Sequence, residues 1–181
     1  MDIKIFKGFE EIYPEKIEGT DSWYYGQWTP CSEAYEVPCY KNKYPGTKLY
    51  LIEFPSGKVY EPIKQEMNVF LERPVYDNKD NLFGIIRYDF NKEVIQVLAY
   101  KPEWPGVKTI TEIPFSKAGD LVNIRLIVSP FALVKHDIQN DAVEFIWPEE
   151  KRYELEKNES LYFQDGGRLY LTKKNQQAIG E

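Results

Sequence analysis

Strand–turn–strand segments recur between about Lys48 and Thr172 of this sequence. Each consists of an apolar run, a short polar turn and a second apolar run. The paired runs are 49–54 with 58–63, 83–90 with 93–100, 132–137 with 142–147, and 160–164 with 168–172. Gly, Asn and Asp at the turns supply the backbone conformations that β-hairpins need. The pattern predicts an all-β fold, built as an antiparallel meander of short hairpins.

Other segments add strands to this scaffold. Apolar and polar residues alternate over 121–128, which is typical of a half-buried strand, and we expect further strands at 22–28 and 107–113. Aromatic residues make up 15% of the 181 residues, a composition that suits pleated surfaces. The sequence leaves three closures open: a barrel, a two-layer sheet and a propeller-like arrangement.

Helices are expected to be few, with at most one or two short ones. Ile63, Met67, Phe70 and Leu71 follow helical spacing, so a short helix and a strand are both open there. Residues 148–158 have helix-like ends but alternate inside, and we favour a strand. Near the start, Ile3 and Ile5 alternate as in a strand.

The length fits one β-rich domain over residues 1–181. Within it, residues 1–46 form an irregular, aromatic-rich N-terminal part, residues 47–172 the hairpin meander, and residues 173–181 a polar tail. No signal peptide or long apolar span is visible, which predicts a cytoplasmic protein without a membrane partner.

The charge balance bears on the partner. The formal net charge is −6, and no cluster of Lys and Arg offsets it. Nucleic-acid binding needs a basic surface, so we expect no nucleic-acid partner. An acidic surface instead suits a protein partner with a basic surface.

The residues of common catalytic sites are sparse. His136 is the sole histidine, and its neighbour Asp137 would point to the opposite face of a strand. No phosphate-binding glycine motif or nucleophile elbow is present. We therefore predict no catalytic residues and no cofactor, and a protein that is not an enzyme is favoured. Cys31 and Cys39 are expected to be reduced thiols, with a disulfide as the alternative, and their spacing predicts no metal site.

Four aromatic residues are the candidate binding residues: Trp23, Tyr25, Trp28 and Trp104. Trp and Tyr combine an apolar ring with a polar group, which suits both sugar stacking and protein hot spots. The alternative is that the rings near Trp23 complete the core.

These observations predict a non-catalytic binding or protein-interaction protein. One concrete form is a bacterial immunity-type protein that uses negative charge to block a basic partner. The first alternative is a carbohydrate-binding module, in which Trp23 and Trp28 would form one exposed platform for a glycan. The second alternative is a small hydrolase that uses a pair of carboxylates.

Overall fold

The computed structural model describes residues 12–165 and 168–173 and is mostly β, with 48% strand and 7% helix. The predicted all-β, antiparallel hairpin fold is confirmed, as is the expectation of at most two short helices. The described residues contain no closed barrel. The chain divides into two compact units, residues 1–122 and 123–181. The single domain over 1–181 stays a prediction.

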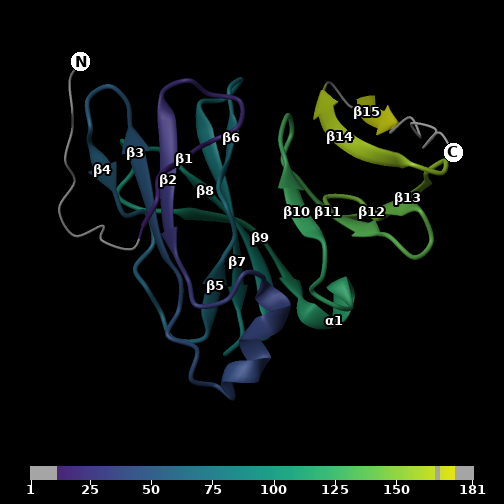
Figure 1. The fold of residues 1–181 in the computed structure, drawn as a ribbon, viewed down its shortest axis with the longest axis horizontal. Coiled ribbons are helices and arrows are strands. Elements are labelled where there is room, and N and C mark those ends of the chain that lie inside the picture. The colour runs from purple at the N-terminus through teal and green to yellow at the C-terminus, as the bar shows by residue number, and fades with distance from the viewer. Residues whose placement is uncertain (1–11, 166–167, 174–181) are drawn as a thin grey trace, which may run out of the picture. The chain divides into compact units, whose positions relative to one another are not determined.

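The first sheet of unit 1 has the strand order β1-β2-β3-β4. Its strands are β1 (Glu15–Lys16), β2 (Trp23–Trp28), β3 (Lys48–Glu53) and β4 (Val59–Tyr60). Figure 1 shows β2 beside β3, where their backbones pair antiparallel without a bulge. The strand predicted at 22–28 is thus confirmed. A 3-10 helix, η1 (Ala34–Tyr40), lies between β2 and β3, within the N-terminal part that the sequence predicts to be irregular.

The second sheet of unit 1 has the order β5-β7-β8-β9, and β6 also pairs with β7. Its strands are β5 (Val69–Leu71), β6 (Val75–Asp77), β7 (Leu82–Asp89), β8 (Val94–Tyr100) and β9 (Lys108–Pro114). The short helix α1 (Phe115–Ala118) follows β9.

The helix considered over residues 63–71 is wrong. Asn68 has a positive φ of 59°, which an α-helix does not allow, and the backbone of β5 pairs with β7. All three residues of β5 are buried, so both of its faces are covered. A strand covered on both faces reads as a continuous apolar run, and a helical spacing within such a run is coincidental.

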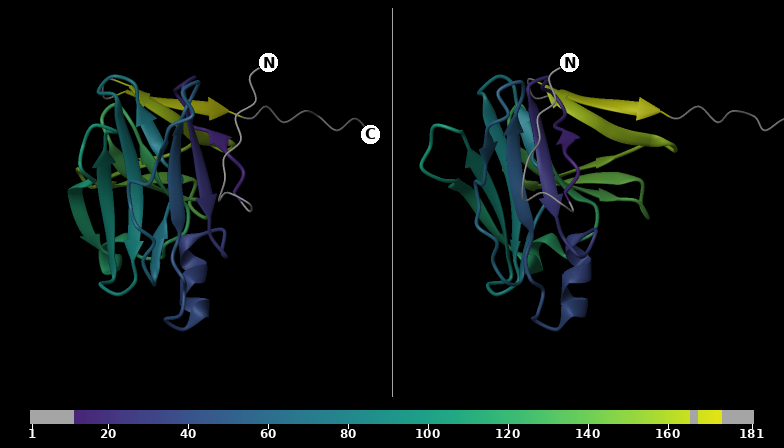
Figure 2. Two further views of the ribbon diagram at one scale, coloured as in Figure 1. Left: turned by 90° about the vertical axis from the view of Figure 1, so that its left-hand side faces the viewer. Right: turned by 60° about the vertical axis from the view of Figure 1, so that its left-hand side comes forward.

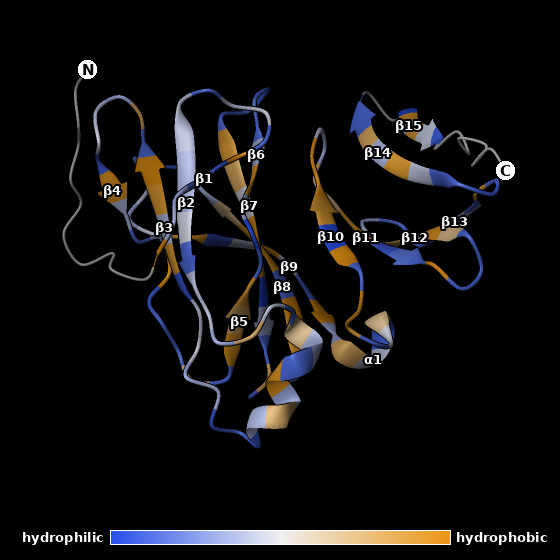
Figure 3. Ribbon diagram, in the orientation of Figure 1, coloured by the Kyte–Doolittle hydropathy of each residue, from blue (hydrophilic) through white to orange (hydrophobic). Residues whose placement is uncertain are grey.

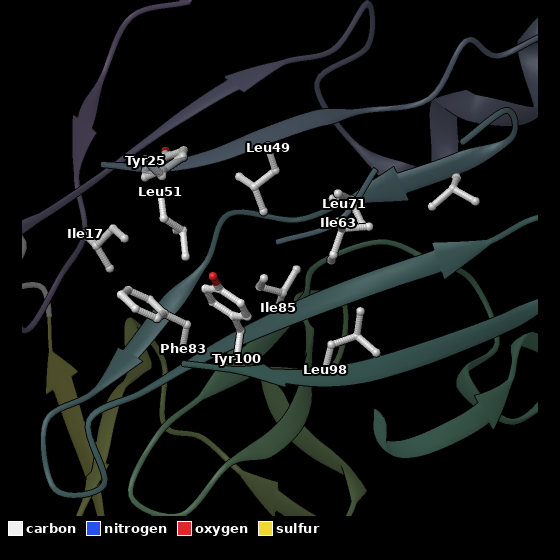
Figure 4. Close-up of a cluster of buried hydrophobic side chains, with 11 residues drawn as sticks. Ile17, Tyr25, Leu49, Leu51, Ile63, Leu71, Phe83, Ile85, Leu98 and Tyr100 are labelled. Atoms are coloured by element: carbon white, nitrogen blue, oxygen red, sulfur yellow. The ribbon is translucent and has the colours of Figure 1, made fainter. Parts of the chain in front are cut away.

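The core of unit 1 lies between its two sheets. Leu49 and Leu51 of β3 point toward Ile85 of β7 and Leu98 of β8, as Figure 4 shows. These four side chains are at most 2% exposed. In Figure 3, β5 is coloured as hydrophobic, whereas β2 is pale because it consists largely of Trp and Tyr. Unit 1 is therefore the two-layer arrangement among the three predicted closures.

Unit 2 contains a four-stranded sheet and a separate two-stranded one. The four strands are β10 (Ile124–Ile127), β11 (Ala132–Asp137), β12 (Ala142–Trp147) and β13 (Lys151–Glu154). The two-stranded sheet is the hairpin of β14 (Glu159–Asp165) and β15 (Arg168–Lys173), drawn in yellow in Figure 2. A small core joins the two sheets, with Val134, Val143 and Leu161 among its buried members.

All four predicted hairpins are present, as the pairs β3–β4, β7–β8, β11–β12 and β14–β15. The strands expected at 107–113 and 121–128 correspond to β9 and β10. The strand favoured within 148–158 is β13. The strand predicted around Ile3 and Ile5, and nearly all of the predicted polar tail, lie outside the described residues.

Candidate functional site

Two of the four predicted binding residues face the core. Trp23 and Tyr25 lie on one face of β2, as their spacing predicted. Tyr25 is only 5% exposed, and its hydroxyl donates to Glu15 at 2.7 Å. Trp23 packs edge-on against Phe83, with ring centroids 5.0 Å apart. This placement is the core role that the sequence offered as the alternative for these rings.

The other two predicted residues are partly exposed. Trp28 lies on the opposite face of β2 from Trp23, so the two rings do not form one platform. Lys48 Nζ lies 5.4 Å from the centroid of the Trp28 ring. Trp104, in the loop between β8 and β9, has Lys108 Nζ at 3.9 Å from its ring centroid. A role of these four residues in binding stays a prediction.

A pocket of about 280 Å³ opens in unit 1 where the end of β2 meets the end of β5. The amide of Gln27 links the two sides by donating to the carbonyl of Leu71 at 2.7 Å. The backbone N–H of Glu72 donates to the carbonyl of Ile86 at 3.0 Å, which fixes Glu72 beside β7. The lining residues are Gln27, Thr29, Pro30, Cys31, Ser32, Phe70, Glu72 and Arg73.

Glu72 is the ionisable group that the pocket perturbs most. Burial raises the pKa of its carboxyl to about 7, Arg73 opposes the shift, and the negative charge of Glu33 adds to it. No described residue donates a hydrogen bond to this carboxylate. Arg73 is largely solvent-exposed, and it also lies 3.9 Å from the carboxylate of Glu15. The pocket therefore holds a poorly solvated carboxylate with unused acceptor capacity.

The thiol in this pocket is not set up as a nucleophile. Cys31 is 8% exposed, and burial raises the pKa of its thiol, although Thr29 and Tyr44 partly offset the rise. The Tyr44 hydroxyl shares hydrogen bonds of 2.8 Å with both Thr29 and Thr47. These bonds hold the wall of the pocket in place, while burial keeps Cys31 in its protonated form at neutral pH.

A second feature lies on the β14–β15 hairpin of unit 2. Leu161 pairs with Leu171, but the next pair is Phe163 with Tyr170, so Tyr162 is an extra residue that forms a β-bulge. Leu161 is buried in the core of unit 2. Simple alternation would place Phe163 on the same face as Leu161. The bulge instead turns Phe163 to the outer face, beside Tyr170.

The three aromatic side chains of the hairpin form one exposed group, which we call the hairpin aromatic face: Tyr162, Phe163 and Tyr170. They are 67%, 42% and 39% exposed, respectively. The rings of Phe163 and Tyr170 stack with centroids 4.3 Å apart and an interplanar angle of 5°. Tyr162 contacts Phe163 edge-on at 5.3 Å. Large rings gathered at the surface in this way mark an interaction site more often than isolated ones do.

Polar pairs flank this face along the hairpin. Ser160 and Thr172, whose hydroxyls lie 2.9 Å apart, precede it on the same side. Asp165 pairs with Arg168 at the other end, next to the turn. An apolar centre with a polar rim is the usual anatomy of a protein interface.

Cys31 and Cys39 are not joined by a disulfide in this structure, and the reduced state of both thiols stays a prediction. Among residues 12–165 and 168–173, no three His, Cys, Asp or Glu side chains gather as metal ligands. In the same part of the chain, no helix has the length and apolar character to cross a membrane.

Sequence reasoning missed both Glu72 and the hairpin aromatic face, although each leaves a trace. Glu72 is a carboxylate placed directly after the apolar run of β5, where a strand would continue. Tyr162 and Phe163 are adjacent aromatic residues on one strand, so alternation must send one of them outward. The spacing alone does not show that a bulge sends both to the surface.

Comparison with known proteins gives no match, whether to protein-family models, to curated proteins or to solved structures.

Proposed function

We propose that this chain is a non-catalytic binding protein that contacts a protein partner with a basic surface through the hairpin aromatic face. The observation that carries the proposal is the β-bulge at Tyr162, which turns Phe163 out of the core and beside the exposed ring of Tyr170. Burial of large aromatic rings supplies much of the energy at protein interfaces, and Tyr is enriched among hot-spot residues.

The basic character of the partner follows from charge and from ring chemistry. The chain carries a formal net charge of −6, which attracts a cationic protein over long range. Aromatic faces also bind Lys and Arg side chains. Lysines of the chain already cover Trp28 and Trp104. In the described part of the chain, no cation lies over the rings of the hairpin aromatic face, so these rings are free to accept one from a partner.

The test is retention of a partner from a lysate of the source organism on immobilised full-length protein. The wild type is compared with a Phe163→Ser/Tyr170→Ser double variant. The matched control is Tyr35→Ser, which removes an aromatic ring that is 48% exposed in unit 1. We expect the wild type and the control to retain the same basic protein, and the double variant to lose it.

Salt dependence provides an independent readout on the retained complex. The proposal predicts faster association at low than at high ionic strength, because screening shortens the reach of the charges. Retention of no protein, or equal retention by the double variant, would contradict the proposal. A retained partner that is acidic would contradict its electrostatic part.

A further inference from the structure

We propose that the pocket beside Glu72 binds the guanidinium or ammonium group of a small organic cation. This site shares no residue with the hairpin aromatic face, so its test is independent of the function proposed above.

The size of the pocket limits the ligand. Drug-sized ligands occupy about 300–1,000 Å³. The volume of about 280 Å³ here therefore fits only a small molecule or the end of a longer one. The exposed ring of Pro30 supplies an apolar surface for an alkyl or planar group, while Glu72 lines the same space. A short apolar stem with a charged head matches this combination.

Two hydrogen-bond acceptors of the pocket are available to a ligand that carries donors. The Glu72 carboxylate receives no hydrogen bond from the described residues. The Gln27 amide uses one of its two N–H groups on Leu71, and its oxygen is a further acceptor. A guanidinium group presents several N–H donors in one plane and pairs well with a carboxylate. A bound cation would thus satisfy acceptors that are otherwise poorly hydrated.

The charges around Glu72 favour a cation. The negative charge of Glu33 repels that of Glu72. Arg73 is the one described cation that attracts the Glu72 carboxylate, and the neighbouring carboxylate of Glu15 partly neutralises its charge. The other titratable groups that face this region are Cys31 and Tyr88, and burial raises the pKa of each, so both are neutral at pH 8. With Glu72 ionised, a positive ligand gains Coulomb attraction that a neutral ligand of the same shape does not.

The experiment is calorimetric titration of the full-length protein at pH 8 with n-butylguanidinium and, separately, with n-butylurea, its neutral analogue. We expect saturable binding of the cation and at least about tenfold weaker binding of the urea, since a hydrogen bond to a charged group is worth more than a neutral one. Glu72→Gln keeps the shape of the side chain and removes its charge. We expect this variant to bind n-butylguanidinium at least about tenfold more weakly than the wild type. Glu103→Gln, which removes an exposed carboxylate from the loop between β8 and β9, is the matched control.

Two further readouts separate a binding defect from a folding defect. Circular dichroism should show that Glu72→Gln is folded, and the carboxyl resonance of Glu72 should titrate at lower pH when the cation is bound. A short acetylated, amidated peptide containing arginine distinguishes sources: tighter binding than n-butylguanidinium assigns the cation to a protein side chain. Equal binding of both small probes, equal binding by the folded Glu72→Gln variant, or no saturable binding would overturn the proposal.

Discussion

At the scale of single residues, Glu72 illustrates how position changes chemistry. The same side chain on the surface would be ionised at neutral pH, but in the pocket burial raises its pKa to about 7. In the unfolded chain the carboxyl returns to its ordinary value, so the folded state binds more protons between about pH 4.5 and 7. The contribution of Glu72 to stability therefore falls as pH rises through this range.

This linkage predicts a pH-dependent gain in stability for Glu72→Gln. At pH 8 the variant should be more stable than the wild type by about 1–3 kcal/mol, because a poorly solvated charge is removed. At pH 4 the two proteins should differ little, because Glu72 is protonated in both states. Urea denaturation at both pH values, followed by tryptophan fluorescence, measures the difference, and a gain that is equal at both would contradict the argument.

Gly46 is a second residue whose identity is fixed by its surroundings. Its φ is +92°, and a Cβ atom built there would lie 2.0 Å from the carbonyl oxygen of Glu66. Both the backbone conformation and the close approach exclude a side chain without local rearrangement.

We expect Gly46→Ala to lower the free energy of unfolding by about 2 kcal/mol or more. The control is Gly106→Ala, because nothing lies within 4 Å of a Cβ atom at that position. The control should change stability by less than about 0.5 kcal/mol. Thermal unfolding of the three proteins tests this, and similar losses in both variants would show that the contact with Glu66 is not the cause.

At the scale of secondary-structure elements, buried hydroxyls connect strands that the sequence keeps apart. Thr47 Oγ1 lies 2.8 Å from the Tyr44 hydroxyl and accepts from the backbone N–H of Leu71 at 3.2 Å. Thr47 is 1% exposed, so these groups have no access to water. The bonds join the start of β3 to β5 and, through Tyr44, to the wall of the Glu72 pocket.

Thr47→Val should therefore destabilise unit 1 by about 1–3 kcal/mol, because the buried N–H of Leu71 loses its acceptor while the side-chain volume is nearly unchanged. Thr109→Val on β9 is the control, since Thr109 is exposed. Chemical denaturation of both variants measures the effect. A loss for Thr109→Val as large as that for Thr47→Val would show that the effect is not specific to this bond.

At the scale of the whole molecule, the two units differ in the size of their cores. Among the described residues, a cluster of eleven buried side chains lies between the sheets of unit 1, whereas the cluster that joins the sheets of unit 2 has five. Small cores supply little stabilisation, and two-stranded hairpins such as β14–β15 add little by themselves. The free energy of local opening should therefore differ between the units.

Hydrogen exchange on the full-length protein tests this difference. We expect backbone amides of β11 and β12 to exchange at least about tenfold faster than those of β7 and β8. The result also bears on the predicted single domain: equal protection in both units would indicate one cooperative unit over the described residues, whereas separate exchange rates would indicate two.

Features set by neighbours in the chain can be predicted from the sequence, whereas features set by distant residues cannot. Hairpin positions such as 83–90 with 93–100 followed from alternation and turn residues, because the pleat and the turn are set by neighbours in the chain. The helical spacing over 63–71 gave a wrong alternative, because β5 is buried on both faces and a continuous apolar run fits a helix and a buried strand equally well.

Which side chains are buried, exposed or shifted in pKa depends on the tertiary structure. Tyr25 is a core residue because the sheet that contains β2 packs against the sheet that contains β7 and β8. Glu72 is poorly solvated because the end of β2 covers it. Phe163 reached the surface because pairing with β15 accommodates an extra residue at Tyr162. Desolvation and strand register depend on residues distant in the chain, so no local pattern in the sequence contains them.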